Sequence, residues 1–458
     1  MRSPGARRSS APPRSAGFVV SDAPASAARD YRGLMRNRAY LRVFSAGLGS
    51  IAGSSIAGVC LIWLVATATG SPLDVGLLGT AWVVGGILFS VFGGAWVDRY
   101  NRRNLMVLAD FARASALGIV VLILAWGGFE LFPVLAAYFV LGAFTTIFNP
   151  AEQAIVPALV EPRLVADANG LVRSSRSTLQ FVGASLGGVL IVTVGSLAGV
   201  AVNALTFLIS GLLLIGLEVP RAERPPPIAR PNYFAEVREG FRWLWRATAL
   251  LQLTLSATIF NFCSTLVGAF LVFFATAVLH GSALLFAVLL AAEVAGSAIG
   301  SLLVGRTDAV RWAGRAWVVP QGVVSGGVVV ALVLDPVAPV AVAALFSLGL
   351  LAGFAGTAWL TVAQMVVPTE MQGRYFGIDA LGSIAILPAA QIGGAFLITG
   401  FGVGPTYLLA GAIWTVAGVG FLFPRALWNL GYRAGDPTRR SADGELGTSG
   451  SPGGTRDA

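Results

Sequence analysis

Long apolar runs without charged residues recur along the chain and constrain its fold more than any other feature. A helix needs roughly 20 such residues to cross the hydrocarbon core of a bilayer. Of the 458 residues, 56% are hydrophobic and 12% are charged, against about 45–50% and about 25% in soluble domains. The sequence therefore predicts an all-α integral membrane protein with twelve transmembrane helices, at 41–69, 75–97, 105–127, 132–150, 172–195, 197–217, 249–279, 282–304, 315–334, 338–365, 375–400 and 404–423.

The basic residues, all of them Arg, lie in the two tails, on alternate connections, or near the segment ends beside those connections. The other connections, near 70–74, 127–132, 195–197, 280–282, 335–337 and 401–404, contain no Arg. Because Arg collects in cytoplasmic loops, both termini and the central loop are expected in the cytoplasm, with the protein in the plasma membrane. This topology also accounts for the net charge of +9, so no nucleic-acid partner is expected.

The segments fall into two groups of six separated by a polar loop, and the two groups resemble each other. In both groups a Gly-Ser pair followed by an apolar run leads into the second segment, as TGSPLDVGLLGTAW (69–82) and HGSALLFAVLLAAE (280–293). Parallel six-helix repeats are a transporter design with the substrate site between the halves. We expect a disordered cytoplasmic tail at 1–40, an N-terminal half at 41–217, a cytoplasmic loop at 218–248, a C-terminal half at 249–424 and a second disordered cytoplasmic tail at 425–458.

A concentrated group of charges, GGAWVDRYNRR (93–103), follows the second segment. It resembles the signature loop of the major facilitator superfamily. Asn101 replaces the second Gly of that signature, and Asn tolerates a positive φ better than most residues. The matching positions are Gly94, Asp98, Arg99, Arg102 and Arg103. The resemblance implies the fold of that superfamily and a gating cluster that holds the two halves together on the cytoplasmic face.

Two further stretches, NPAEQAIVPALVEPRLVADANGL (149–171) and MQGRYFGIDAL (371–381), resemble the siderophore- and macrolide-exporting branch of that superfamily. This resemblance implies export of an amphipathic small molecule. In the third segment, Asp110 and Arg113 are three residues apart, as in a helical ion pair. Either they form a local pair near the headgroups or they belong to the gating cluster. No acid lies in the first segment, which makes a proton site in the first half doubtful.

Glu293 is the acid placed deepest in an apolar segment. It lies 13 residues from both His280 and Arg306, so the helical rise places it near the bilayer centre. A dry carboxyl is neutral and a wet one ionised, which makes Glu293 our candidate for proton coupling. The alternative is a permanently protonated Glu that donates a hydrogen bond between helices. Gly296 and Gly300 share its helix face and favour a position inside the bundle.

Other polar and aromatic residues are weaker candidates for the substrate cavity, and we selected Asn261, Gln391, Trp63 and Phe260. The chain has one His and two Cys, both inside apolar runs, so we expect neither a metal, a disulfide nor a cofactor. The sequence thus predicts a monomeric, proton-coupled exporter of a small molecule. An importer of a small metabolite and a non-transporting receptor or scaffold remain as alternatives. An enzyme or ATP-driven pump is not expected, because a chain without Lys lacks the phosphate-binding loop.

Overall fold

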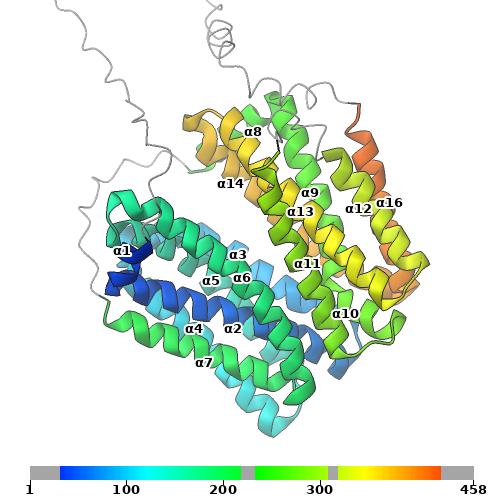
Figure 1. Ribbon diagram of the computed structural model, residues 1–458, viewed down its shortest axis with the longest axis horizontal. Coiled ribbons are helices and arrows are strands. Elements are labelled where there is room, and N and C mark those ends of the chain that lie inside the picture. Colours follow the sequence, from blue (N-terminus) through cyan, green and yellow to red (C-terminus); the bar gives the residue numbers. More distant parts are fainter. Residues whose placement is uncertain (1–30, 218–232, 308–317, 424–458) are drawn as a thin grey trace, which may run out of the picture.

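The computed structural model describes residues 31–217, 233–307 and 318–423. The two expected tails and part of the central loop lie outside these residues. The described chain is helical throughout, and each of the twelve expected segments falls on a helix (Figure 1). The all-α prediction is confirmed.

The N-terminal half consists of a short helix followed by six long ones. Their bounds are α1 (Tyr31–Arg36), α2 (Arg38–Thr69), α3 (Pro72–Arg99), α4 (Arg102–Gly127), α5 (Leu131–Leu159), α6 (Val165–Thr193) and α7 (Ser196–Ile215), with the 3₁₀ turn η1 (Pro162–Leu164) before α6.

In the C-terminal half, two of the expected segments are interrupted. The seventh is made of α9 (Thr248–Ala269), α10 (Leu271–Phe273) and the π-helical turn η2 (Phe274–Val278), and the eleventh of α14 (Thr369–Ala385) and α15 (Leu387–Phe401). The others are single helices, α11 (Ala283–Val304), α12 (Val318–Leu334), α13 (Ala338–Val366) and α16 (Val403–Gly420), and α8 (Tyr233–Arg246) precedes them.

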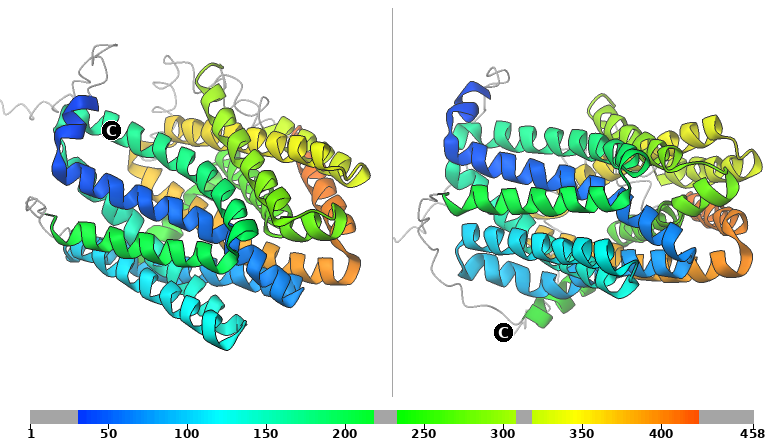
Figure 2. Two further views of the ribbon diagram at one scale, coloured as in Figure 1. Left: turned by 60° about the horizontal axis from the view of Figure 1, so that its bottom comes forward. Right: turned by 90° about the horizontal axis from the view of Figure 1, so that it is seen from below.

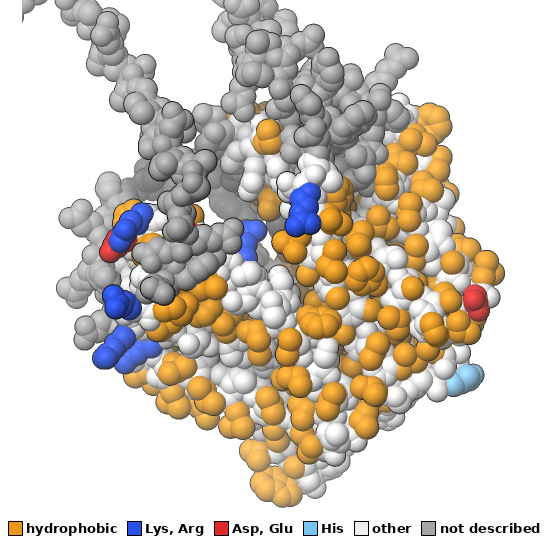
Figure 3. Space-filling view, in the orientation of Figure 1, with side chains coloured by type: hydrophobic (Ala, Val, Ile, Leu, Met, Phe, Trp, Pro, Cys, Tyr) orange, Lys and Arg blue, Asp and Glu red, His pale blue; other side chains and the backbone are white. Residues whose placement is uncertain are grey.

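Ten of the described helical segments are long and apolar enough to cross a membrane. The exceptions among the twelve are α12, which is shorter, and α6. The first half of α6 is polar, VADANGLVRSSRSTLQ. A polar stretch of that length has to face protein or water rather than lipid. In contrast, apolar side chains such as Leu302 and Val416 are largely exposed, as expected for a surface that meets lipid. Figure 3 shows hydrophobic side chains across much of one face.

Local signals explain where the helices begin and end. Gly70, Gly128, Gly195 and Gly402 have positive φ values at connections without Arg, where Gly permits a sharp reversal. Asn101 has a φ of −67° and is the N-cap of α4, its side chain accepting a hydrogen bond from the Arg103 amide. Tolerance of a positive φ is therefore not used at Asn101, and the residue is explained by capping.

The helices of each half pack through glycine. A Cβ built at Gly349 of α13 would overlap the carbonyl oxygen of Glu293 in α11, and one at Gly296 would overlap the carbonyl of Phe346. In the first half, Gly142 of α5 lies against the backbone of Trp82 in α3 in the same way. Such small residues let transmembrane helices approach closely, as expected for the face that carries Gly296 and Gly300.

The two halves meet along only part of their length. They lie side by side at the ends joined by the connections without Arg and diverge toward the Arg-rich ends (Figures 1 and 2). Packing of α6 on α11 and of α3 on α15 joins them. Gly188 lies against Ala287, and Trp63 of α2 stacks on Phe286 of α11 with ring centroids 6.0 Å apart. The helices of the two halves thus separate toward the Arg-rich side.

Candidate functional site

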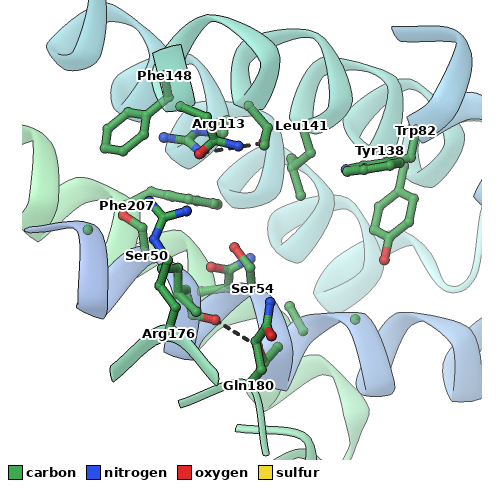
Figure 4. A pocket seen from close by; sticks show the side chains of 18 residues that line it. Ser50, Ser54, Trp82, Arg113, Tyr138, Leu141, Phe148, Arg176, Gln180 and Phe207 are labelled. Atoms are coloured by element: carbon green, nitrogen blue, oxygen red, sulfur yellow. Dashed lines mark hydrogen bonds between the residues drawn. The ribbon is translucent and has the colours of Figure 1, made fainter. Parts of the chain in front are cut away.

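A partly open cavity of about 330 Å³ lies in the N-terminal half. Its wall combines aromatic rings, hydroxyl groups, amides and two guanidinium groups (Figure 4). Every lining residue belongs to α2–α7: Gly47, Ser50, Ile51, Ser54, Ser55, Ala57, Gly58, Trp82, Arg113, Tyr138, Leu141, Thr145, Phe148, Asn149, Arg176, Gln180, Asn203 and Phe207. We call it the N-terminal cavity.

Arg113 is held on every side. Its guanidinium lies between two rings, 4.6 Å from the centroid of Phe148 and 4.3 Å from that of Phe207, where the ring faces attract a cation. Its Nη2 donates to Oδ1 of Asp110 at 2.5 Å, and Ser210 donates to the other carboxylate oxygen at 2.5 Å. Asp110 is 0% exposed and Arg113 3%. The two residues form a buried ion pair within the N-terminal half.

A second ion pair joins Glu152 of α5 to Arg176 of α6, whose Nη2 donates to the carboxylate. Glu152 is 3% exposed and lies against Gly47 of α2, where a Cβ would overlap its carboxylate. The carboxylates of both pairs stand behind the wall, whereas Arg113 and Arg176 line the cavity. The described lining contains no acidic residue, so its charged groups are both cationic.

Three buried polar atoms in this wall have no hydrogen-bond partner among the described residues. They are Ser50 Oγ, Arg176 Nε and Asn203 Nδ2. Buried polar groups nearly always have a partner, and leaving one unpaired costs about 1–3 kcal/mol. These atoms are buried in the wall, so a water or ligand group satisfies them only by entering the wall from the cavity.

Arg102 and Arg103 of the charged loop bind backbone carbonyls within their own half. Arg102 donates to the carbonyl of Ala154 in α5 at 2.8 Å, and Arg103 donates to the carbonyls of Ile215 and Leu217 at the end of α7 at 3.2 and 3.3 Å. Cations at a helix C-terminus are stabilising. Gly94, Asp98 and Arg99 belong to α3, but their side chains lie outside the described set, so their part in gating stays a prediction.

Glu293 lies in the C-terminal half, away from the N-terminal cavity. It lines a small cavity of about 10 Å³ with residues of α9, α13 and α16. Trp414 lines it too, and its Nε1 has no hydrogen-bond partner among the described residues. The side chain of Glu293 thus faces neighbouring helices. No ion pair to Glu293 is found in the described part of the chain.

The four residues selected for the substrate cavity lie elsewhere. Thr80 donates to Gln391 between the halves at 3.1 Å, and Trp63 packs across the same boundary. Phe260 is buried against Phe421 with centroids 6.3 Å apart, and Asn261 is exposed on α9. None of the four lines the N-terminal cavity.

Sequence reasoning used Arg176 only as a topology marker and gave Glu152 no role. The sequence feature that could have pointed to these two residues was the polar first half of α6, in a chain whose other segments are mostly apolar. The described residues hold no group of three or more potential metal ligands. Cys60 and Cys263 are both buried and free.

Comparison with known proteins places these features in a family context. The model of the Major Facilitator Superfamily matches residues 43–389. An uncharacterized MFS-type transporter of Bacillus subtilis, YvqJ, is 21% identical over 391 residues, 84% of this chain and 92% of the relative. Macrolide efflux protein A of Streptococcus pyogenes is 22% identical over 372 residues, 80% of this chain and 90% of the relative.

A further relative is the multidrug efflux pump Tap of Mycobacterium tuberculosis. It is 28% identical over 236 residues, 48% of this chain, and the chain spans only about half of its length, 55%. Among solved structures, an inward-facing bacterial homologue of the lysosomal transporter Spinster has a TM-score of 0.63 at 17% identity, covering 87% of this chain and 98% of that one. An inward-facing bacterial homologue of ferroportin also has a TM-score of 0.63, at 16% identity, covering 85% of this chain and all of that one. These structures establish the shared fold.

Proposed function

The chain belongs to the Major Facilitator Superfamily, and on this premise we propose that it is a secondary active exporter. It carries an amphipathic small molecule, such as a drug, macrolide or siderophore, out of the cytoplasm in exchange for protons. The observation that carries this proposal is the N-terminal cavity, whose aromatic and polar wall suits a molecule with both kinds of surface. We propose no catalytic chemistry and no cofactor for the chain.

The arrangement of the halves supports transport by alternating access. They are joined through α3–α15 and α6–α11 and diverge at the Arg-rich ends. In the topology favoured by the Arg distribution, these Arg-rich ends and both termini face the cytoplasm. The cavity then opens inward, and the transported molecule leaves after the contacts between the halves have rearranged. The transporter works as a monomer in the plasma membrane.

The direction of transport rests on the relatives. Buried polar residues do not decide between import and export, because an importer of a metabolite needs several of them and Asp110, Arg113 and Glu152 are all buried here. Two relatives, by contrast, are named as efflux proteins, and one of them aligns over 80% of this chain. Export is therefore favoured over import of a metabolite.

Two residues outside the cavity have further roles in this proposal. Glu293 binds and releases the proton as the cavity beside it becomes dry or wet. Asp98 joins the cytoplasmic gating cluster when the cleft closes, so Asp98→Asn should leave the protein inserted and slow transport. Normal abundance with a normal rate in that variant would remove the gating role.

Gradient-driven accumulation is the test of the proposed function. Inside-out membrane vesicles from expressing cells are given an acidic lumen and a radiolabelled macrolide or an amphipathic dye. We expect uptake that a protonophore abolishes, and none in vesicles from cells without the gene. Binding of the probe without gradient-driven uptake would instead indicate a receptor, and uptake in right-side-out vesicles would indicate an importer.

A further inference from the structure

We infer that the N-terminal cavity is a subsite for a carboxylate group of the transported molecule, with Arg176 as its cationic partner. The inference rests on the proposed function and narrows the substrate class to amphipathic organic acids. It starts from a property of the wall rather than from any relative. All charged side chains among the lining residues are Arg, and both acids of the neighbouring ion pairs stand outside the lining.

The two arginines differ in how much of their binding capacity is used. Arg113 has ring faces on both sides and an ion pair with the buried Asp110, so it is fixed as part of the wall. Arg176 has one carboxylate partner, Glu152, and its side chain retains 27% exposure. A guanidinium has five N–H donors in a fork that matches a carboxylate. Arg176 is therefore the guanidinium that can accept a second anion.

The unpartnered atoms point to the same chemistry. No described residue accepts a hydrogen bond from Arg176 Nε or Asn203 Nδ2, and Ser50 Oγ has no hydrogen-bond partner either. Asn203 is 0% exposed and Ser50 5%. An ionised carboxylate only accepts hydrogen bonds, so a carboxylate that enters the wall beside these buried atoms satisfies them. An ammonium ligand would add donors to a wall that already has unsatisfied ones and two positive charges.

The remaining wall defines the rest of the ligand. Trp82, Tyr138, Leu141 and Phe148 line the cavity beside the polar groups (Figure 4). Aromatic walls of this kind suit a flat apolar body, and the volume of about 330 Å³ lies at the small end of ligand pockets, roughly 300–1,000 Å³. A compact aromatic acid fits this description.

Glu152 occupies the position of a competitor. Its carboxylate already binds Arg176, so an incoming acid must share that guanidinium or displace Glu152 from it. Removing the charge of Glu152 should therefore strengthen binding of an acid, whereas a purely structural ion pair would give no such gain. The change in acid affinity of a Glu152→Gln variant therefore distinguishes a ligand subsite from a purely structural ion pair.

The test compares 2-naphthylacetate with 2-naphthylacetamide, which has the same ring and no charge. Binding to the purified full chain in lipid nanodiscs is measured by isothermal titration calorimetry. We expect the acid to bind at least about tenfold more tightly than the amide. Glu152→Gln should tighten acid binding several-fold and leave amide binding unchanged.

Removal of Arg176 alone would leave Glu152 buried without a partner, which can unfold the protein. The informative variant is therefore the pair Glu152→Gln and Arg176→Gln. It should lose at least about tenfold in acid binding while keeping amide binding. The matched control neutralises the exposed pair of Glu161 and Arg163, joined at 2.7 Å, and should bind both probes as the native chain does.

Equal binding of acid and amide, or native acid binding by the double variant with thermal stability retained, would overturn the inference. Its failure is distinguishable from failure of the proposed function. A protein that accumulates a macrolide or dye in vesicles but does not prefer the acid is an exporter without this subsite. A protein that prefers the acid through Arg176 but accumulates neither the macrolide or dye nor 2-naphthylacetate in the vesicles has the subsite and lacks the proposed function.

Discussion

The hydroxyl of Thr80, in the N-terminal half, donates a hydrogen bond to Oε1 of Gln391, in the C-terminal half, at 3.1 Å. The contact is close on both sides, because a Cβ built at Gly79 would lie 2.6 Å from Nε2 of Gln391 and one at Gly76 would lie 2.6 Å from its backbone oxygen. In alternating access this contact has to separate when the other side of the protein closes.

A covalent link at this contact should therefore stop transport. We expect that Thr80→Cys with Gln391→Cys, in a background lacking Cys60 and Cys263, loses gradient-driven uptake when treated with a short thiol cross-linker that is cleaved by reductant. Reduction should restore the rate. The two single-cysteine variants serve as controls and should be unaffected by the same treatment. A cross-linked protein that transports at the native rate would show that this contact does not open.

Asp110→Asn should destabilise the protein strongly, because it leaves Arg113 buried without its ionic partner. Breaking a buried pair in this way costs roughly 3 kcal/mol, and the loss should appear as a lower midpoint of thermal unfolding in detergent. Neutralising both residues should cost less than the single change. Glu161→Gln, in an exposed pair, should cost at most about 1 kcal/mol. A double-variant loss equal to the sum of the losses from Asp110→Asn and from neutralising Arg113 alone would mean that the pair is not coupled.

Gly349→Ala should weaken the packing of α11 on α13. The added methyl would overlap the carbonyl of Glu293, so the helices must separate, at a cost of about 1–3 kcal/mol. Gly356→Ala in the same helix is the matched control, because a Cβ there meets no atom within 4 Å. Unfolding midpoints of the two variants give the comparison, and similar midpoints would contradict the packing described here.

Glu293→Gln should separate binding from coupling. The Gln side chain keeps the shape of the small cavity but carries no titrating proton. We expect substrate exchange across vesicle membranes to persist while accumulation driven by a pH gradient is lost. Uphill pumping by this variant, with only a pH gradient supplied, would exclude Glu293 as the coupling residue and leave it as a hydrogen-bond donor between helices.

Single cysteines test the membrane orientation. With the native cysteines removed, Pro225→Cys in the central loop should react with a membrane-impermeant thiol reagent only from the cytoplasmic side, and Phe129→Cys only from outside. Intact cells are first treated with the impermeant reagent and then opened and labelled again. Only the cysteine on the outer side should be blocked by the first treatment. Labelling of both positions from one side would require a different count of crossings.

The sequence predicted the helices well because a crossing segment is a local property. A run of about 20 apolar residues is visible without knowledge of its neighbours, and it marked even the interrupted segment made of α14 and α15. The polar half of α6 was harder to interpret, because Ala168 is the only buried residue in it and the direction of its exposed polar side chains depends on how α6 packs on α2 and α11.

The cavity could not be predicted in the same way. Ser50, Arg113, Arg176 and Asn203 come from four helices, and their meeting depends on the rotation of each helix about its axis. One turn of difference in register would place Arg176 away from Glu152. Asp110 and Arg113 were predictable as a pair because both lie on one helix, three residues apart. Gln391 and Trp63 join the halves and do not line the N-terminal cavity, so their role at the substrate stays a prediction.

All side chains around the N-terminal cavity come from one half, whereas Glu293 belongs to the other. Under the functions proposed for them, the N-terminal half selects the ligand and the C-terminal half binds the coupling proton. The sequences of the two halves can therefore diverge independently. A hybrid with this N-terminal half and the C-terminal half of a relative would inherit the ligand preference of this chain and the driving ion of the other parent.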